Sequence, residues 1–164
     1  MPQTYNILVL PGDGIGPEVM AEALKVLNVF NTPERQFKTT TELIGGCSID
    51  KHGKPVTPEV LQAAIDADAV LFGAAGGPKW DKQRRGLDGP EGGLLQVRRA
   101  MQIYANLRPC SADSPSPNIA REFSPFREEV IRDVDFVVLR ENCGGAYFGK
   151  KIENDDYGQF LFHR

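Results

Sequence analysis

The stretch YNILVLPGDGIGPEV, residues 5–19, contains the signals that decide the fold. Its apolar run at residues 5–10 predicts a buried strand, and the glycines of residues 12–16 predict a tight turn. Pro17 suits the first position of a helix, because the N–H that proline lacks has no partner there anyway. Apolar residues then recur near a 3.6-residue period, which predicts an amphipathic helix whose buried face consists of Val19, Ala23, Val26, Leu27 and Phe30.

The same alternation continues along the chain. Residues 37–43 alternate polar and apolar side chains as in a half-buried strand, and Thr57 and Pro58 predict the start of a helix that runs to about Asp66. Residues 69–74 predict another strand. This β-α-β-α-β order favours an α/β fold with a largely parallel sheet over an all-helical or all-β fold.

The second half is less regular. Residues 78–93 predict a long functional loop, residues 94–104 a helix, and residues 105–109 an extended segment. Residues 111–125, with three prolines, predict an irregular connection, and residues 135–139 predict a strand that ends on Arg140. We expect a change of domain in this part of the chain.

Composition excludes several classes of protein. With 41% hydrophobic and 25% charged residues the chain has the composition of an ordinary soluble globular protein. A net charge of -3 provides no general attraction for nucleic acid or an anionic membrane. No apolar stretch has the length of a signal peptide or membrane span, which favours a cytoplasmic protein. The cysteines, Cys47, Cys110 and Cys143, lie far apart, which predicts reduced thiols and neither disulfides nor a zinc site.

The glycine turn after the first strand invites a comparison with dinucleotide-binding motifs. In the pattern GxGxxG counted from Gly12, the third glycine would fall at Pro17. The close helix-to-strand packing that this glycine permits is therefore not encoded. The turn predicts a plain strand-turn-helix connection, which can still lie beside a ligand, and not a Rossmann fold.

Arginines at the ends of predicted elements give a further signal. Leu94 and Leu95 precede Arg98 by four and three residues, so all three share one helix face. Arg108 precedes a proline in an extended segment, and Arg140 ends a strand. A ligand with two carboxylates needs several such planar donors, because arginine binds carboxylate in a bidentate manner. The alternative is that these are surface arginines that pair with some of the 22 acidic residues.

Five sequence blocks occur in the order found in 3-isopropylmalate dehydrogenases. They are LPGDGIGPEV (10–19), LFGAAGGPKWD (71–81), PEGGLLQVRR (90–99), YANLRP (104–109) and GGAYFG (144–149). The chain resembles this family, which belongs to the β-decarboxylating dehydrogenase superfamily with isocitrate, homoisocitrate and tartrate dehydrogenases. The resemblance implies an isopropylmalate/isocitrate dehydrogenase-like layered α/β fold with two domains, both incomplete here. Residues 1–105 form the amino-terminal part of the first domain, and residues 106–164 begin the second, the dimerisation domain. It fades after about Lys151, and Gly89 stands where many members have arginine.

The resemblance also implies roles for individual residues. The substrate carboxylates are expected to be bound by Arg98, Arg108 and Arg140. The isopropyl group is expected to lie near Glu91, Leu94 and Leu95. The residues expected to contact NAD are Ile15, Gly77, Pro78, Lys79, Trp80 and Glu91. Tyr147 matches the tyrosine that acts as the catalytic acid, which its ordinary pKa near 10 suits.

The implied reaction is the oxidative decarboxylation of 3-isopropylmalate, a dicarboxylate, with NAD and Mg²⁺ or Mn²⁺ in leucine biosynthesis, by a homodimer. The metal ligands and the catalytic lysine are expected outside these 164 residues, so the chain alone is expected to be inactive. Isocitrate enzymes typically place serine and asparagine where this chain has Leu94 and Leu95, although Glu141 and Asn142 are similar to those relatives. Two alternatives stay open: another β-decarboxylating dehydrogenase, or a catalytically silent chain that acts only by binding.

Overall fold

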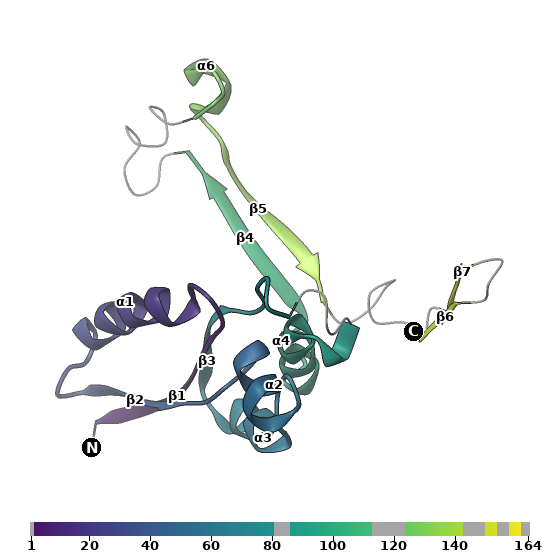
Figure 1. Cartoon of the computed structure of the whole chain (residues 1–164). Coiled ribbons are helices and arrows are strands. Elements are labelled where there is room, and N and C mark those ends of the chain that lie inside the picture. The colour runs from purple at the N-terminus through teal and green to yellow at the C-terminus, as the bar shows by residue number, and fades with distance from the viewer. Residues whose placement is uncertain (1, 81–85, 113–123, 143–149, 154–157, 162–164) are drawn as a thin grey trace. The chain divides into compact units, whose positions relative to one another are not determined.

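The computed structural model describes residues 2–80, 86–112, 124–142, 150–153 and 158–161 (Figure 1). The chain divides into two compact units, Met1–Gln102 and Ile103–Arg164.

A three-stranded parallel sheet organises the first unit. Its strands are β1 (Gln3–Gly12), β2 (Arg35–Thr41) and β3 (Ala69–Ala74), in the order β2-β1-β3. β1 is parallel to both neighbours, with Ile7 opposite Thr39 on one side and Ala69 on the other. The predicted α/β class with a parallel sheet is therefore confirmed.

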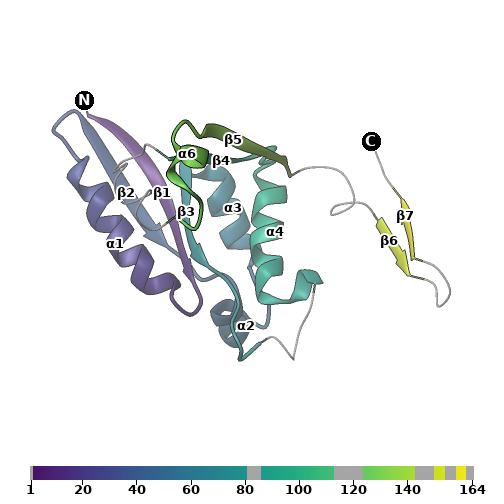
Figure 2. The same ribbon diagram turned by 90° about the horizontal axis from the view of Figure 1, so that it is seen from above.

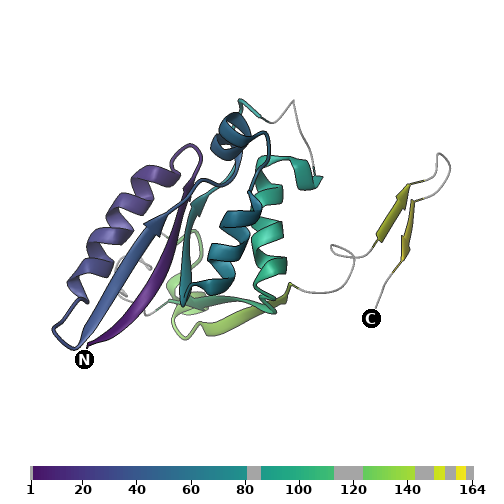
Figure 3. The same ribbon diagram turned by 90° about the horizontal axis from the view of Figure 1, so that it is seen from below.

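Helices cover both faces of this sheet. α1 (Gly16–Val29) lies on one face, and α3 (Pro58–Asp66) and α4 (Pro90–Ala100) lie on the other (Figures 2 and 3). Successive residues of β1 point to opposite faces, so Ile7 and Val9 pack with Met20 of α1 while Leu8 and Leu10 enter the larger core. Burying each such aliphatic side chain contributes roughly 1.5–3 kcal/mol. The larger core consists of Leu8, Leu10, Ile44, Val56, Val60, Ala64 and Val97.

The buried face of α1 differs from the predicted one. Met20, Leu24 and Leu27 pack toward the sheet, and of these only Leu27 was predicted. Val19 and Val26 are 48% and 60% exposed, and Ala23 and Phe30 are also exposed. Apolar residues occupy both sides of this helix, so their period identified the helix but could not decide which side meets the sheet.

Helix α2 (Gly46–His52) was not predicted, because Gly45 and Gly46 were interpreted only as the end of a strand. Gly45 has φ +85°, a conformation that favours glycine, and it directly precedes the first turn of this helix. The next helix, α3, begins as predicted. The Thr57 side chain accepts a hydrogen bond from the N–H of Val60 at 3.5 Å, and Pro58 is the first helical residue.

Helix α4 begins at Pro90 and not at Leu94, so the predicted loop over residues 78–93 was too long. A short 3-10 turn, η1 (Gly86–Asp88), precedes it. Gly92 and Gly93 lie inside the helix. Both positions require glycine, because a Cβ on either would collide with backbone atoms of Leu87 or Pro55. The helix ends at Ala100 and not near residue 104, and Gln102 follows with φ +53°.

The second unit contains a two-stranded antiparallel ribbon. β4 (Ala105–Ser111) pairs with β5 (Asp135–Glu141), so both extended segments predicted here are strands. Helix α6 (Glu128–Ile131) precedes β5, and β6 (Lys150–Glu153) pairs with β7 (Gly158–Leu161). These last three elements were not predicted. Most of the irregular connection expected over residues 111–125 lies outside the described residues.

Candidate functional site

Two glycine turns meet at the carboxyl ends of β1 and β3. The N–H of Asp13, just after β1, donates to the carbonyl of Ala74 at 2.8 Å. Gly14 and Gly76 both have positive φ, of +57° and +97°, and a Cβ on Gly14 would lie 3.9 Å from the carbonyl oxygen of Gly76. In open parallel sheets ligands bind outside the carboxyl ends of the strands, so this edge is the candidate site in the first unit.

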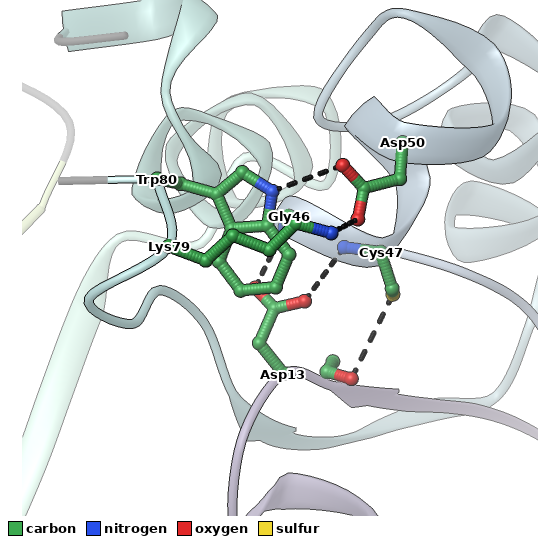
Figure 4. A network of polar contacts seen from close by, with 7 residues as sticks. Asp13, Gly46, Cys47, Asp50, Lys79 and Trp80 are labelled. Carbon is green, nitrogen blue, oxygen red and sulfur yellow. Dashed lines mark hydrogen bonds and ion pairs between the residues drawn. The ribbon is translucent and has the colours of Figure 1, made fainter. Parts of the chain in front are cut away.

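Asp13 joins three separate segments at this edge. The residue is nearly inaccessible to solvent, at 3% exposure, and its carboxylate accepts three backbone N–H bonds. The donors are Gly46 at 2.6 Å and Cys47 at 2.7 Å (Figure 4), and Gly76 at 2.9 Å. A buried carboxylate is tolerated only when such donors replace water. Asp13 therefore fixes the start of α2 and the start of the loop after β3 relative to β1.

Asp50 holds the other end of that loop. One carboxylate oxygen accepts from the Lys79 ammonium at 2.6 Å, and the other accepts from the Trp80 indole N–H at 3.2 Å (Figure 4). The Lys79 hydrogen bond, followed by the one from Trp80, lowers the pKa of Asp50 below its ordinary value. Lys79 also lies 5.1 Å from the centre of the Trp80 ring. These three side chains thus form one polar and aromatic cluster beside α2, which we call the Asp50 clamp.

Cys47 lies beside Asp13 but lacks the character of a nucleophile. Its sulfur lies 3.2 Å from the carbonyl oxygen of Ile44 and 3.7 Å from that of Gly12. Partial burial, and then the negative charge of Asp13, raise the pKa of this thiol, so the protonated form predominates at neutral pH. Cys47 and Cys110 are free thiols, as predicted, and Cys143 lies outside the described residues.

The predicted cofactor residues lie mainly around these turns. Ile15 follows the first glycine turn and is exposed, and the segment from Gly77 to Trp80 follows the second. The N–H of Trp80 donates to the carbonyl of Gly77 at 3.0 Å, which closes a turn across Pro78 and Lys79. The structure therefore brings the loops that carry Ile15 and residues 77–80 together. Glu91 is exposed in the first turn of α4.

The predicted substrate residues are divided between the two units. Leu94, Leu95 and Arg98 all lie on α4, where each is partly buried. Arg108 and Arg140 belong to the β4–β5 ribbon of the second unit.

The register of the ribbon relates these two arginines. Arg140 lies opposite Asn106 and Arg108 lies opposite Val138. Opposite residues, and residues two apart on a strand, point to the same face, so Arg108 and Arg140 are diagonal neighbours on one face. The Arg108 Nε–H donates to the side-chain oxygen of Asn106 at 3.1 Å on that face. Tyr147 lies outside the described residues.

Asp13 and Asp50 are the polar residues that the sequence interpretation missed. Asp13 offered one signal, an aspartate between two glycines at the end of a buried strand, where turn aspartates commonly accept backbone N–H bonds. Asp50 offered none, because its partners are 29 and 30 residues away. Within the described part of the chain, His, Cys, Asp and Glu side chains nowhere gather in a group of three or more that could hold a metal ion.

Comparison with known proteins identifies the family. Residues 6–161 match the model of the isocitrate/isopropylmalate dehydrogenase family, and the chain belongs to that family. It is 72% identical over 155 residues to 3-isopropylmalate dehydrogenase B of Aspergillus niger, a match that covers 94% of this chain and 42% of that protein. It is 53% identical over 164 residues to the 3-isopropylmalate dehydrogenase of Hapsidospora chrysogena, over 99% and 42% of the two chains. The chain thus spans about 42% of the length of these relatives, in their amino-terminal part.

Solved structures agree on the fold. A β-decarboxylating dehydrogenase from Thermococcus kodakarensis matches with a TM-score of 0.61 and 28% identity, over 96% of this chain and 40% of that one. The isocitrate dehydrogenase of Methylococcus capsulatus matches with a TM-score of 0.70 and 24% identity, over 97% and 42%. The fold is therefore the isopropylmalate/isocitrate dehydrogenase-like α/β fold, in incomplete form, as predicted. Among the helices that the structure describes, none is long and apolar enough to cross a membrane.

Proposed function

We propose that this chain belongs to a 3-isopropylmalate dehydrogenase, to which it supplies the loop of residues 77–80 that contacts NAD and the arginines that bind the substrate carboxylates. That enzyme converts 3-isopropylmalate to 2-oxo-4-methylpentanoate and carbon dioxide with reduction of NAD, a step of leucine biosynthesis. The observation that carries the proposal is the partly buried face of α4, where Leu94 and Leu95 lie beside Arg98 in a chain that belongs to this family.

The two leucines favour isopropylmalate over the substrates of related enzymes. Burying a branched aliphatic group against them is worth roughly 1.5–3 kcal/mol, or about one to two orders of magnitude in affinity. A third carboxylate at the same place would meet hydrocarbon and lose its hydration without a polar partner. Isocitrate carries that third carboxylate, so it is the weaker candidate.

The arginines are proposed to bind the two malate carboxylates. Guanidinium groups stay charged at every physiological pH and match carboxylate geometry through two parallel N–H bonds. Arg108 and Arg140 share one face of the β4–β5 ribbon, as two ligands of one small dianion must. We propose that Arg98 completes this set of carboxylate-binding arginines in the whole enzyme.

Residues of the two glycine turns are proposed to bind NAD, which supplies the hydride acceptor when bound. Positive-φ glycines at the carboxyl edge of the sheet leave the backbone open to close approach, which fits a dinucleotide. We assign this role to Ile15 and the segment from Gly77 to Trp80, with Glu91 near the nicotinamide. Tyr147 is proposed to deliver the proton that completes the product.

Other parts of the reaction are assigned to the remainder of the enzyme. By the family resemblance, we propose that the oxygen ligands of Mg²⁺ or Mn²⁺ and the catalytic lysine belong to the part of the enzyme that this chain does not cover. A cytoplasmic homodimer is the proposed form of the complete enzyme. We expect the 164-residue chain to show no NAD reduction with 3-isopropylmalate and Mg²⁺, and steady turnover by the chain alone would contradict this division of roles.

A chimera tests the proposal. The 155 matching residues of this chain replace the corresponding part of the Aspergillus niger relative, and NAD reduction is measured with 3-isopropylmalate, isocitrate, homoisocitrate and tartrate. We expect kcat/KM for isopropylmalate to exceed the others by at least about tenfold. The matched variant Leu94→Ser with Leu95→Asn should lower kcat/KM for isopropylmalate by about 10–100-fold. Faster turnover of isocitrate by the unmodified chimera would sink the assignment.

A further inference from the structure

We propose that Asp50 is a positioning residue for the dinucleotide: through the Asp50 clamp it sets the conformation of Lys79 and Trp80 and thereby the affinity for NAD. The inference rests on the proposed function of the loop that carries these two residues. Asp50 acts through Lys79 and Trp80 and does not itself contact the ligand in this proposal.

The geometry of the clamp makes Asp50 specific for two consecutive side chains. Each carboxylate oxygen serves a different donor, Oδ2 the ammonium of Lys79 and Oδ1 the indole N–H of Trp80. A neutral side chain can replace at most one of these two contacts with an equivalent bond, because the pairing with Lys79 depends on charge. Lys79 and Asp50 remain partly exposed, with side-chain exposures of 63% and 44%, so a variant at position 50 leaves the core intact.

The clamp acts on a loop whose other end is already fixed. Asp13 binds the N–H of Gly76 at the start of the loop, and it also binds the first two N–H groups of α2. Asp50 lies on that same helix, one turn further along. Asp13 anchors α2, and the carboxylates of Asp13 and Asp50 hold the two ends of the segment 76–80 against this helix.

This arrangement predicts an effect on binding more than on chemistry. A loop that is ordered before the ligand arrives loses less conformational freedom on binding, so releasing Lys79 and Trp80 weakens affinity. The ion pair also neutralises the charge of Lys79, which keeps the ammonium from being drawn into other contacts. Removing Asp50 should therefore raise the KM for NAD and leave the handling of the carboxylate substrate largely unchanged.

Trp80 reports the clamp directly, because it is the one tryptophan in the sequence. In the 164-residue chain, Asp50→Ala should increase the quenching of Trp80 fluorescence by acrylamide, and Asp50→Asn should increase it less, because an amide oxygen can still accept the indole N–H. Glu22→Ala is the matched control, since Glu22 forms an exposed 2.6 Å ion pair with Lys25 on α1, away from the loop. Equal quenching in the parent chain and Asp50→Ala would overturn the clamp.

The chimera then tests the effect on NAD. Asp50→Ala should raise the KM for NAD on the order of tenfold, with kcat and the KM for isopropylmalate changed less than about twofold, and Asp50→Asn should restore part of the difference. A working parent chimera whose KM for NAD is unchanged in Asp50→Ala overturns the inference alone. The inference is overturned as well if kcat and both KM values worsen together, since that indicates general damage. A parent chimera that does not use NAD contradicts the proposed function itself, and the inference falls with it.

Discussion

The ring of Trp80 packs so closely on Gly46 that a Cβ at position 46 would overlap it. Gly46→Ala should therefore displace the ring, shift Trp80 fluorescence toward longer wavelength and break its bond to Asp50. Gly53→Ala, at the other end of α2, is the control. A Cβ there meets no atom within 4 Å, but φ is +72°, so the variant should lose about 1–2 kcal/mol with unchanged Trp80 emission. Unchanged emission in Gly46→Ala would refute the packing.

Removing the Asp13 carboxylate should destabilise the first unit severely. Asp13→Ala leaves three N–H groups at the edge of the core without their acceptor, and each such loss costs about 1–3 kcal/mol. We expect a loss of more than about 3 kcal/mol in the free energy of unfolding, measured by urea denaturation. Asp66→Ala, an exposed carboxylate on α3, should stay within about 0.5–1 kcal/mol of the parent. Comparable losses in the two variants would contradict the anchoring role of Asp13.

Gly93→Ala should lower stability although alanine favours helices by about 1 kcal/mol over glycine. The added Cβ would lie 2.7 Å from the carbonyl oxygen of Pro55 and 2.9 Å from the Ile44 side chain, so α4 must move away from the core. Circular dichroism during thermal unfolding should give a lower Tm. Arg99→Ala, on the exposed side of α4, should leave the Tm nearly unchanged. A higher Tm for Gly93→Ala would show that the contact is looser than described.

Alkylation of Cys47 should be slow at neutral pH, and its rate should increase only at a higher pH than that of an ordinary cysteine. Its raised pKa keeps the thiol protonated near pH 8, where a free cysteine already forms some thiolate. Because the folded pKa lies above the ordinary value of 9.0, the associated stability is present below pH 9 and is lost as pH rises beyond it. Peptide mapping after iodoacetamide treatment measures the rate at Cys47. Rapid modification at pH 7, before unfolding, would rule out this environment.

The sequence predicted the elements whose signals are local. The strand and turn of residues 5–16 and the capping of α3 by Thr57 depend on neighbouring residues, and the structure contains them. The alternation of strands and helices along the chain then predicted the parallel sheet. The start of α4 was misplaced, because Gly92 and Gly93 indicate a loop by propensity, whereas their lack of a Cβ permits contact with distant backbone. Only tertiary packing distinguishes these two uses of glycine.

The candidate site divides in the same way. Arg98 was singled out by the helix face that it shares with two leucines, and Arg108 and Arg140 by their places in or at the ends of extended segments. The loop of residues 77–80 was singled out by the family resemblance. Asp13 and Asp50 required the structure, because their partners lie from 29 to 63 residues away in the chain. Sequence spacing also could not tell which face of α1 is buried, since Met20 and Val19 are adjacent and both apolar.

The shared acceptor at Asp13 also concerns how the folded molecule opens. The amide protons of Gly46, Cys47 and Gly76 come from two regions of the chain, yet a single buried carboxylate protects all three from solvent. Solvent cannot replace that acceptor for one of them without disturbing the other two. Hydrogen–deuterium exchange should therefore give these amides one common opening free energy once their intrinsic exchange rates are taken into account, as expected for a single cooperative unit that joins the beginning of α2 to the loop after β3.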